Sequence, residues 1–374
     1  MAGIYIHIPF CKKACHYCNF YFSTSAQYRD EMVDCLLAEM ELQRSYLAAQ
    51  PISTIYFGGG TPSILPASDI KRLLDKASSL FEVTTSPEIT LEANPDDLTP
   101  EKLEELTSAG INRLSIGVQS FREEDLRWMN RAHNAEQALT SIVNARAAGI
   151  ENISIDLIYG GPTLTNEGWK ENVAKAIELG VPHLSCYALT VEPGTALDYF
   201  IEKKKIPPVD PDKAAQHFEM LMNWVSDAGY EHYEISNFAQ PGKHSRHNSS
   251  YWKGQPYLGL GPSAHSYNGQ SRQWNVANNP LYMQNIRKGQ VPFEIEELTP
   301  SMKLNEFIMI SLRTAAGCNL EEIAERFGEE KSRQLLAAGS EFIGKGWMML
   351  EGVTLKLTRQ GKFFADGIAA SLFF

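Results

Sequence analysis

Short apolar segments alternate with helical stretches over the first half of the chain, and this alternation restricts the fold more than any other feature. The predicted strands are Ile4–Ile8, Ser53–Phe57, Glu88–Ala93, Arg113–Val118, Asn152–Ile158 and His183–Leu189. Several are nearly continuous apolar runs, which is typical of strands covered on both faces. Six repeated β-α units predict a parallel α/β sheet with right-handed crossovers, either doubly wound or curved into a barrel.

Helix signals fill the gaps between these strands. In one predicted helix Thr99 precedes Pro100 at the first helical position, and Gly110 supplies the C-terminal stop. Leu103 and Leu106 lie between them at helical spacing. The next predicted strand begins almost at once, as a β-α repeat requires.

The pattern changes beyond the sixth strand. Residues 239–269 are predicted to be a loop because prolines and glycines interrupt them repeatedly. From about Glu297 the segments MKLNEFIMISLRTAAG and LEEIAERFG have helical patterns, and MLEGVTLKLT resembles a short hairpin. We therefore predict a first domain at 1–235, a connecting region at 236–295, and a small winged-helix-like α+β domain at 296–374.

Composition limits the classes of partner and compartment. The 374-residue chain carries a formal net charge of -11, which argues against a broad phosphate-binding surface and so against a nucleic-acid partner. The segment LEEIAERFGEE is acidic where a DNA-recognition helix would be basic. No secretion signal and no apolar run long enough for a transmembrane segment is recognised. Six cysteines, three of them clustered, indicate a reducing cytoplasm and a metal site.

The clustered cysteines follow the first predicted strand in CKKACHYC. Cys11, Cys15 and Cys18 are separated by three and two residues, and no fourth cysteine follows closely. A structural zinc site completed by His7 or His16 is one interpretation of this loop. The other is a four-iron four-sulfur cluster that three thiolates hold, with one iron left open for a chelating ligand.

Polar or glycine-rich segments follow four of the predicted strands. They are GGGTPS at 58–63, LEANPDD ending a strand at Glu92, GVQSF at Gln119 and DLIYGGP at Asp156. Each alone is equally well explained as a turn or helix cap. Together they predict one site, because α/β folds place their sites at the carboxyl ends of parallel strands.

The cysteine spacing, with the aromatic Tyr17 before the last cysteine, resembles the signature of the radical SAM superfamily. YIHIPFC, GGGTPS, GVQSF, DLIYG and GPSAHSY extend the resemblance to the HemN-like coproporphyrinogen dehydrogenase group over nearly the whole chain. It implies a partial (β/α)6 TIM-like barrel in which Cys11, Cys15 and Cys18 hold the cluster. It also implies that S-adenosylmethionine (SAM) is bound by Tyr5, Tyr17, Gly59, Gly60, Thr61, Glu92, Gln119, Arg131, Asp156 and Ala188. Arg131 would pair with the SAM carboxylate through its forked donors.

Two departures separate this sequence from the dehydrogenases. They carry a fourth cysteine two residues after the third, where this chain has Phe20, and they have a longer N-terminal extension. Both features are instead similar to the HemW family of haem chaperones. They predict that coproporphyrinogen dehydrogenation is absent, and leave open whether this radical SAM scaffold acts as an enzyme.

The segment HNSSYW at 247–252 agrees with this family, because it matches the H-N-x-x-Y-W motif of HemW proteins. From the residues alone, His247 in a polar loop is a surface or capping residue; the resemblance makes it the candidate axial ligand of haem. His244 and His265 are the competing candidates. Cys35, Cys186 and Cys318 are predicted to be core or helix-face residues.

The resemblance thus implies a four-iron cluster, SAM and haem, with haem carried as cargo to haem-requiring proteins. Membrane-bound respiratory enzymes fit as recipients, so a cytoplasmic location with peripheral membrane contact is compatible with it, as is a homodimer. Two other functions remain open on the sequence: oxidative decarboxylation of coproporphyrinogen III, and tRNA modification by radical SAM chemistry. The acidic balance and the lack of a basic accessory domain count against the second.

Overall fold

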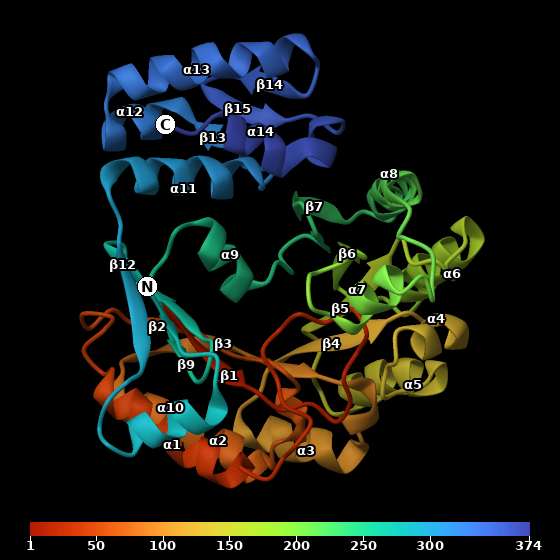
Figure 1. Ribbon diagram of the computed structural model, residues 1–374, viewed down its shortest axis with the longest axis vertical. Helices are drawn as coiled ribbons and strands as arrows, with labels where there is room; N and C mark the ends of the chain where they lie inside the picture. The colour runs from red at the N-terminus through yellow and green to blue at the C-terminus, as the bar shows by residue number, and fades with distance from the viewer.

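The computed structural model describes all 374 residues, and its centre is a sheet whose first six strands pair in parallel in chain order. These strands are β1 (Ala2–Ile8), β2 (Ile52–Gly59), β3 (Val83–Ala93), β4 (Arg113–Gln119), β5 (Ile153–Tyr159) and β6 (His183–Ala188). A doubly wound sheet reverses its strand order part way along. The unbroken order therefore confirms the curved alternative, a partial barrel (Figure 1).

Helices cover the outer face of this sheet. They are α1 (Arg29–Leu42), α2 (Ala67–Leu80), α3 (Pro100–Ala109), α4 (Glu123–Trp128), α5 (Ala135–Ala147), α6 (Asn166–Glu178) and α8 (Pro211–Asp227). The short α7 (Ala196–Glu202) lies instead beyond the carboxyl end of β6, where the Leu197 amide donates to the carbonyl oxygen of His16 in the cysteine loop. The outward residues of β1 (Ile4, Ile6 and Ile8) belong to a core of 55 buried residues between sheet and helices. The predicted cap of α3 is confirmed, because the Thr99 side chain accepts a hydrogen bond from the Lys102 amide.

The sheet continues beyond both of its parallel edges. Next to β1 lie β9 (Tyr257–Leu260), β10 (His265–Tyr267), β11 (Ser271–Asn275) and β12 (Phe293–Glu297), with α10 (Asn279–Ile286) between the last two. Next to β6 lie β8 (Asn237–Ala239) and β7 (Glu231–Glu234). The region predicted to connect two domains thus belongs largely to the barrel sheet, and the predicted boundaries stay predictions.

The prediction of a loop over 239–269 was wrong in part, because α9 (Arg246–Trp252), β9 and β10 lie within it. The glycines there serve close packing. A Cβ on Gly259 would lie 2.0 Å from the carbonyl oxygen of His265, and Gly261 adopts a left-handed φ of +101°. Glycine therefore permits β9 and β10 to pair, although it resembles a strand breaker in the sequence.

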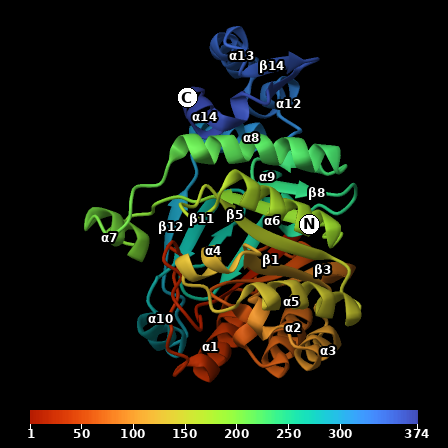
Figure 2. The same ribbon diagram turned by 90° about the vertical axis from the view of Figure 1, so that its right-hand side faces the viewer.

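The last segment forms a separate layer beyond α9 (Figures 1 and 2). Its elements are α11 (Pro300–Leu312), β13 (Cys318–Asn319), α12 (Leu320–Phe327), α13 (Glu329–Gly344), β14 (Met348–Glu351), β15 (Thr354–Leu357) and α14 (Ala365–Ser371). They enclose their own core of 12 buried residues. The order of one helix, a strand, two helices and a hairpin confirms the winged-helix-like arrangement. None of the helices in the structure has the length and apolar character needed to cross a bilayer.

Candidate functional site at the carboxyl ends of the barrel strands

The cysteine loop follows β1 and is fastened at several points. Its first residue, Cys11, donates its amide hydrogen to the carbonyl oxygen of Ser23 at 3.0 Å, so the loop closes on itself. The Asn130 side chain, from the segment after β4, donates to the carbonyl oxygen of Ala14 at 2.7 Å. Lys12 forms an ion pair with Asp96, 2.8 Å away and beyond the end of β3. Neighbouring strand ends thus fix this loop in place.

The three thiols suit a cluster with three protein ligands. Cys11, Cys15 and Cys18 are free and half-buried, whereas the other cysteines, Cys35, Cys186 and Cys318, are buried as predicted. Burial raises the pKa of Cys11 to about 11. Because the thiolate is the iron ligand, cluster binding must release this proton.

Each histidine of the zinc interpretation is held by a partner outside the three thiols. His7 donates from Nε2 to the carbonyl oxygen of Tyr21 at 3.0 Å and accepts the Tyr5 hydroxyl at Nδ1. His16 donates from Nδ1 to the carbonyl oxygen of Trp128 at 2.8 Å. No three His, Cys, Asp or Glu side chains come close enough to hold a single metal ion.

The glycine run after β2 packs against the backbone of the cysteine loop. Gly60 donates to the carbonyl oxygen of Ile8, and Thr61 donates to that of Phe10 at 2.7 Å. A Cβ on Gly60 would lie 2.6 Å from the Phe10 carbonyl oxygen, closer than real contacts allow. The Thr61 hydroxyl also lies 3.4 Å from the Cys11 sulfur. The run therefore sets the position of the cluster loop in addition to forming one wall of the site.

Two carboxyl groups face the barrel interior near the same end. Glu92 accepts the Tyr56 hydroxyl at 2.8 Å and the Gly59 amide at 3.2 Å. Burial raises the pKa of Glu92 to about 7, with a further upward contribution from the charge of Asp156. Burial likewise raises the pKa of Asp156 to about 6. Tyr5 stacks on Tyr56 with ring centroids 6.1 Å apart, so β1, β2, β3 and β5 contribute to one polar surface.

Arg131 joins the cluster loop to the strand ends. Its Nη1 lies 3.2 Å from the Cys15 sulfur and 3.3 Å from the Tyr17 hydroxyl oxygen. Its Nη2 donates to Asn94 at 2.7 Å and to the carbonyl oxygen of Gly117 at 2.8 Å. Its Nε is buried without a hydrogen-bond partner. A ligand carboxylate that binds Nη1 or Nη2 would therefore have to replace one of these hydrogen-bond partners.

The remaining predicted SAM residues lie at the same edge. Gln119 ends β4 with a left-handed φ of +65°, a strained conformation for a residue other than glycine. Ala188 ends β6, where it pairs with Tyr159. The structure thus gathers the predicted SAM residues at one end of the barrel.

Sequence reasoning missed the two asparagines that organise this edge. Asn94 receives Arg131, and Asn130 holds the cysteine loop. Asn94 lies in the LEANPDD segment, in which only Glu92 was predicted to be a site residue. Asn130 directly precedes Arg131 and has a left-handed φ of +61°, which asparagine tolerates better than most residues.

His247 lies at the opposite end of the barrel and is sealed there. Its α9 helix inserts against the early residues of β1 and β2, and the His247 side chain is 1% exposed. Nδ1 hydrogen-bonds to the Thr54 hydroxyl and Nε2 to the Tyr251 hydroxyl, both at 2.8 Å. Its ring stacks on Tyr56 with centroids 4.9 Å apart.

In this conformation neither ring nitrogen of His247 can bind iron, so haem ligation by His247 stays a prediction that requires α9 to leave the barrel. The expectation that it sits in a polar surface loop was wrong, because the ring is buried against Gly3 of β1 and against Thr54 and Tyr56 of β2. The competitors differ from it. His265 is exposed and stacks on Trp274, and His244 is a partly exposed residue just before α9.

Comparisons with known proteins agree with this arrangement. Residues 5–176 match the radical SAM superfamily, and residues 298–364 match the HemN C-terminal domain. The solved coproporphyrinogen III oxidase HemN of Escherichia coli superposes with a TM-score of 0.86 at 24% identity, covering 100% of this chain and 90% of that one. At this identity the likeness shows a shared fold.

Three relatives carry the same name. The haem chaperone HemW of Bacillus subtilis is 35% identical over 372 residues, which are 98% of each chain. HemW of Mycobacterium tuberculosis is 34% identical over 377 residues, 99% of this chain and 94% of the relative. HemW of Escherichia coli is 37% identical over 267 residues, 70% and 69% of the two chains.

Proposed function

We propose that this chain, which belongs to the HemW family of haem chaperones, binds haem and delivers it to haem-requiring proteins. The observation that carries the proposal is the pairing of a complete three-thiol loop with Phe20 in the place of the dehydrogenases' fourth cysteine. The Phe20 side chain is 68% exposed and takes no part in the site around the cysteines. The radical SAM cysteine loop is therefore retained without the fourth cysteine of the porphyrinogen enzymes.

The strand-end site supplies the groups that would hold a cluster and SAM. Cys11, Cys15 and Cys18 would bind the cluster, and the proposed SAM residues are Tyr5, Tyr17, Gly59, Gly60, Thr61, Glu92, Gln119, Arg131, Asp156 and Ala188. When bound, a four-iron cluster with SAM at its open iron supplies one-electron chemistry. Arg131 offers a fixed cation beside the thiols and Glu92 a hydrogen-bond acceptor, so this end of the barrel orients a zwitterionic ligand.

The test is an anaerobic titration of the full chain with haem, followed by absorbance, before and after cluster reconstitution with iron and sulfide. We expect saturable haem binding, cluster absorbance, and transfer of haem to a haem-free acceptor protein. The same preparation is incubated with coproporphyrinogen III, SAM and a reductant. Formation of protoporphyrinogen there, without haem binding, would replace this proposal with the dehydrogenase function.

We further propose that membrane-bound respiratory enzymes are among the recipients, reached by a cytoplasmic chain that contacts the membrane peripherally. Sedimentation with vesicles that contain such an enzyme, against vesicles of the same lipids alone, tests this contact. A homodimer is a separate proposal. Light scattering of the apo and haem-loaded chain decides it, and a monomeric mass in both states would exclude it.

A further inference from the structure

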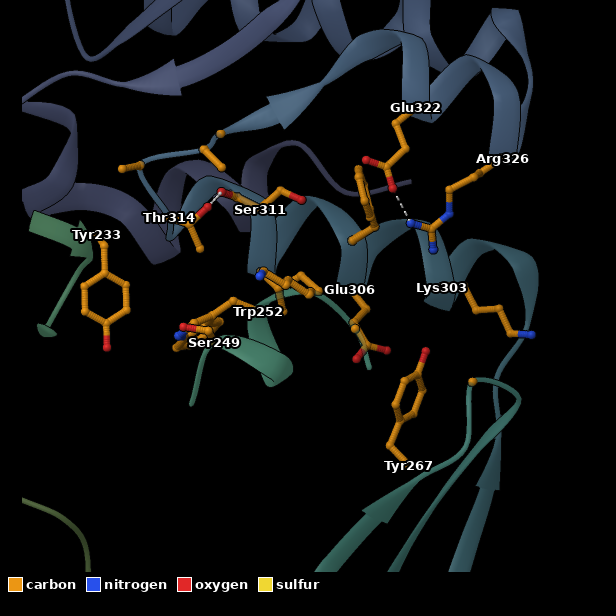
Figure 3. Close-up of a pocket in the computed structure, with 18 of the residues that line it drawn as sticks. Tyr233, Ser249, Trp252, Tyr267, Lys303, Glu306, Ser311, Thr314, Glu322 and Arg326 are labelled. Atoms are coloured by element: carbon orange, nitrogen blue, oxygen red, sulfur yellow. Dashed lines mark hydrogen bonds and ion pairs between the residues drawn. The ribbon is translucent and has the colours of Figure 1, made fainter. Parts of the chain in front are cut away.

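A large cavity lies on the outer side of α9, between that helix and the C-terminal layer. Its volume is about 700 Å³, within the range of small-molecule pockets. Ser249 and Trp252 of α9 line one side, α11 and α12 line another, and Tyr267 of β10 closes an end (Figure 3). The sealed His247 and the open Trp252 are thus on different sides of one short helix.

Aromatic rings make up much of the apolar wall. Trp252 and Tyr267 come from the barrel side, and Phe307 and Phe327 from the C-terminal layer. The guanidinium of Arg326 lies over the Phe307 ring at 4.6 Å and over the Phe327 ring at 5.2 Å. Such a wall favours a flat, conjugated ligand on the ring surfaces that this guanidinium leaves open, because aromatic groups stack face to face or edge to face.

The charged residues of the cavity favour an anion, although the whole chain is acidic. Three cationic residues line it: Lys253, Lys303 and Arg326. The carboxylates already have arginine partners, since Glu306 pairs with Arg272 and Glu322 with Arg326 at 2.8 Å. Neither lysine has a carboxylate partner, and Lys303 donates to the Gln270 side chain instead. A ligand with carboxylates would therefore find unpaired cations at this wall.

His244 supplies a nitrogen suited to a metal at the other end. Its Nε2 donates to the carboxylate of Glu231 at 2.7 Å, while its Nδ1 has no hydrogen-bond partner. Its ring stacks on Tyr233 with centroids 4.1 Å apart, so the orientation is fixed. Metal-binding histidines characteristically donate their second nitrogen to a carboxylate, which fixes the tautomer and raises the basicity of the ligating nitrogen.

We propose that this cavity is the haem site, with His244 as the iron ligand and Lys253 and Lys303 as partners of the propionates. This inference rests on the proposed function, and it names the place and the ligand that the function requires. It assigns Trp252, the last residue of the HNSSYW segment, to the porphyrin wall and leaves His247 inside the barrel. An iron porphyrin satisfies all three features of the cavity: flat, anionic at its rim, and metal-centred.

The ligand is tested by titrating full-length wild type, His244→Ala and His265→Ala with ferric haem. His265 is the matched control because it is exposed and does not line the cavity. We expect His244→Ala to bind haem roughly 10–100-fold more weakly and to lose the Soret position of a histidine-ligated iron. His265→Ala should match wild type. Equal affinity and equal spectra for His244→Ala and wild type would overturn the assignment of the ligand.

The cavity itself is tested with a second pair of measurements. Ala316→Trp places a ring at the cavity wall from an exposed position and should abolish haem binding while leaving cluster reconstitution unchanged. Lys253→Glu with Lys303→Glu should remove the preference for haem over its dimethyl ester. Wild-type affinity in Ala316→Trp, or an undiminished preference in the double variant, would place haem elsewhere.

These results separate the two proposals. Wild type that binds no haem contradicts the proposed function itself. Wild type that binds haem, together with cavity variants that bind it equally well, leaves the function standing and removes this site. A variant that fails to reconstitute the cluster is treated as misfolded. The remaining cavity variants then decide whether haem binds at this site.

Discussion

The two ends of the barrel use the same strands for opposite purposes. At the carboxyl end, half-buried thiols, two carboxyl groups with raised pKa values and the unpartnered Arg131 Nε face one another. At the amino end, α9 fills the opening, and His247 has a protein partner on each ring nitrogen. The two groups of side chains thus differ in hydrogen bonding: Arg131 keeps one unpartnered nitrogen at the carboxyl end, whereas both ring nitrogens of His247 are paired at the amino end. On the outer side of α9, His244 resembles the carboxyl end, because its Nδ1 has no hydrogen-bond partner.

The largest effect that would distinguish the two ends of the barrel is expected at the three thiols. Replacing Cys11, Cys15 and Cys18 together by alanine should abolish cluster incorporation, because it removes all three thiolates proposed to hold the cluster. The measurement is iron and sulfide content with absorbance after anaerobic reconstitution. Cys318→Ala, in the core of the C-terminal layer, is the control and should incorporate a full cluster. A cluster in the triple variant would contradict the site.

At the closed end, His247→Ala should lower the free energy of unfolding by about 4 kcal/mol. It removes a buried ring and leaves the Thr54 and Tyr251 hydroxyls unpaired. Denaturant unfolding measures the loss, with the exposed His265→Ala as the comparison. Haem affinity of the folded variant should equal that of wild type. Unchanged stability with lost haem binding would instead make His247 the ligand and α9 a movable plug.

At the carboxyl end of the barrel, Glu92 should make the free energy of unfolding depend on pH. Because the folded-state pKa of Glu92 is raised to about 7, the folded protein binds a proton that the unfolded chain releases near 4.5. The free energy of unfolding should therefore be highest below that range and fall as pH rises through 7, by at most about 3 kcal/mol. Glu92→Gln should make this fall smaller in the ligand-free protein, while Glu39 and Asp156, whose pKa values burial raises to about 7 and about 6, keep their own contributions.

The control for this pH series is Glu171→Gln, whose side chain is 73% exposed in wild type. Unfolding curves of the three ligand-free proteins from about pH 4 to about pH 8, a range that includes both pKa values of Glu92, provide the comparison. Parallel curves for wild type and Glu92→Gln would show that this carboxyl does not hold its proton in the folded state.

The smallest expected effect is at the glycine run. Gly60→Ala should destabilise the chain by about 2 kcal/mol and weaken cluster retention, because the new Cβ would press on the Phe10 backbone. Gly161→Ala has open space at its Cβ and should leave both properties unchanged. Melting temperature and cluster lifetime measure the two effects. Normal retention in Gly60→Ala would show that the cysteine loop adjusts freely.

Much of the site could be predicted because its signals are local in the sequence. The spacing of Cys11, Cys15 and Cys18, and the polar residues that end successive strands, identify one edge of a parallel sheet before any coordinates exist. The β-α alternation predicts the strands themselves, and all six were confirmed. The resemblance to one family supplied the identity of the ligands.

The sequence alone determined the parallel strands, the three-cysteine loop and the small C-terminal layer, since spacing and periodicity along the chain encode each of them. Only the tertiary structure decided the positions of the histidines. His244 and His247 are three residues apart, yet one lines a cavity and the other fills the barrel, because α9 begins between them and presents different faces to the two. Which hydrogen-bond partners a side chain finds depends on segments distant in the chain, such as Thr54 and Glu231, and no local pattern records that choice.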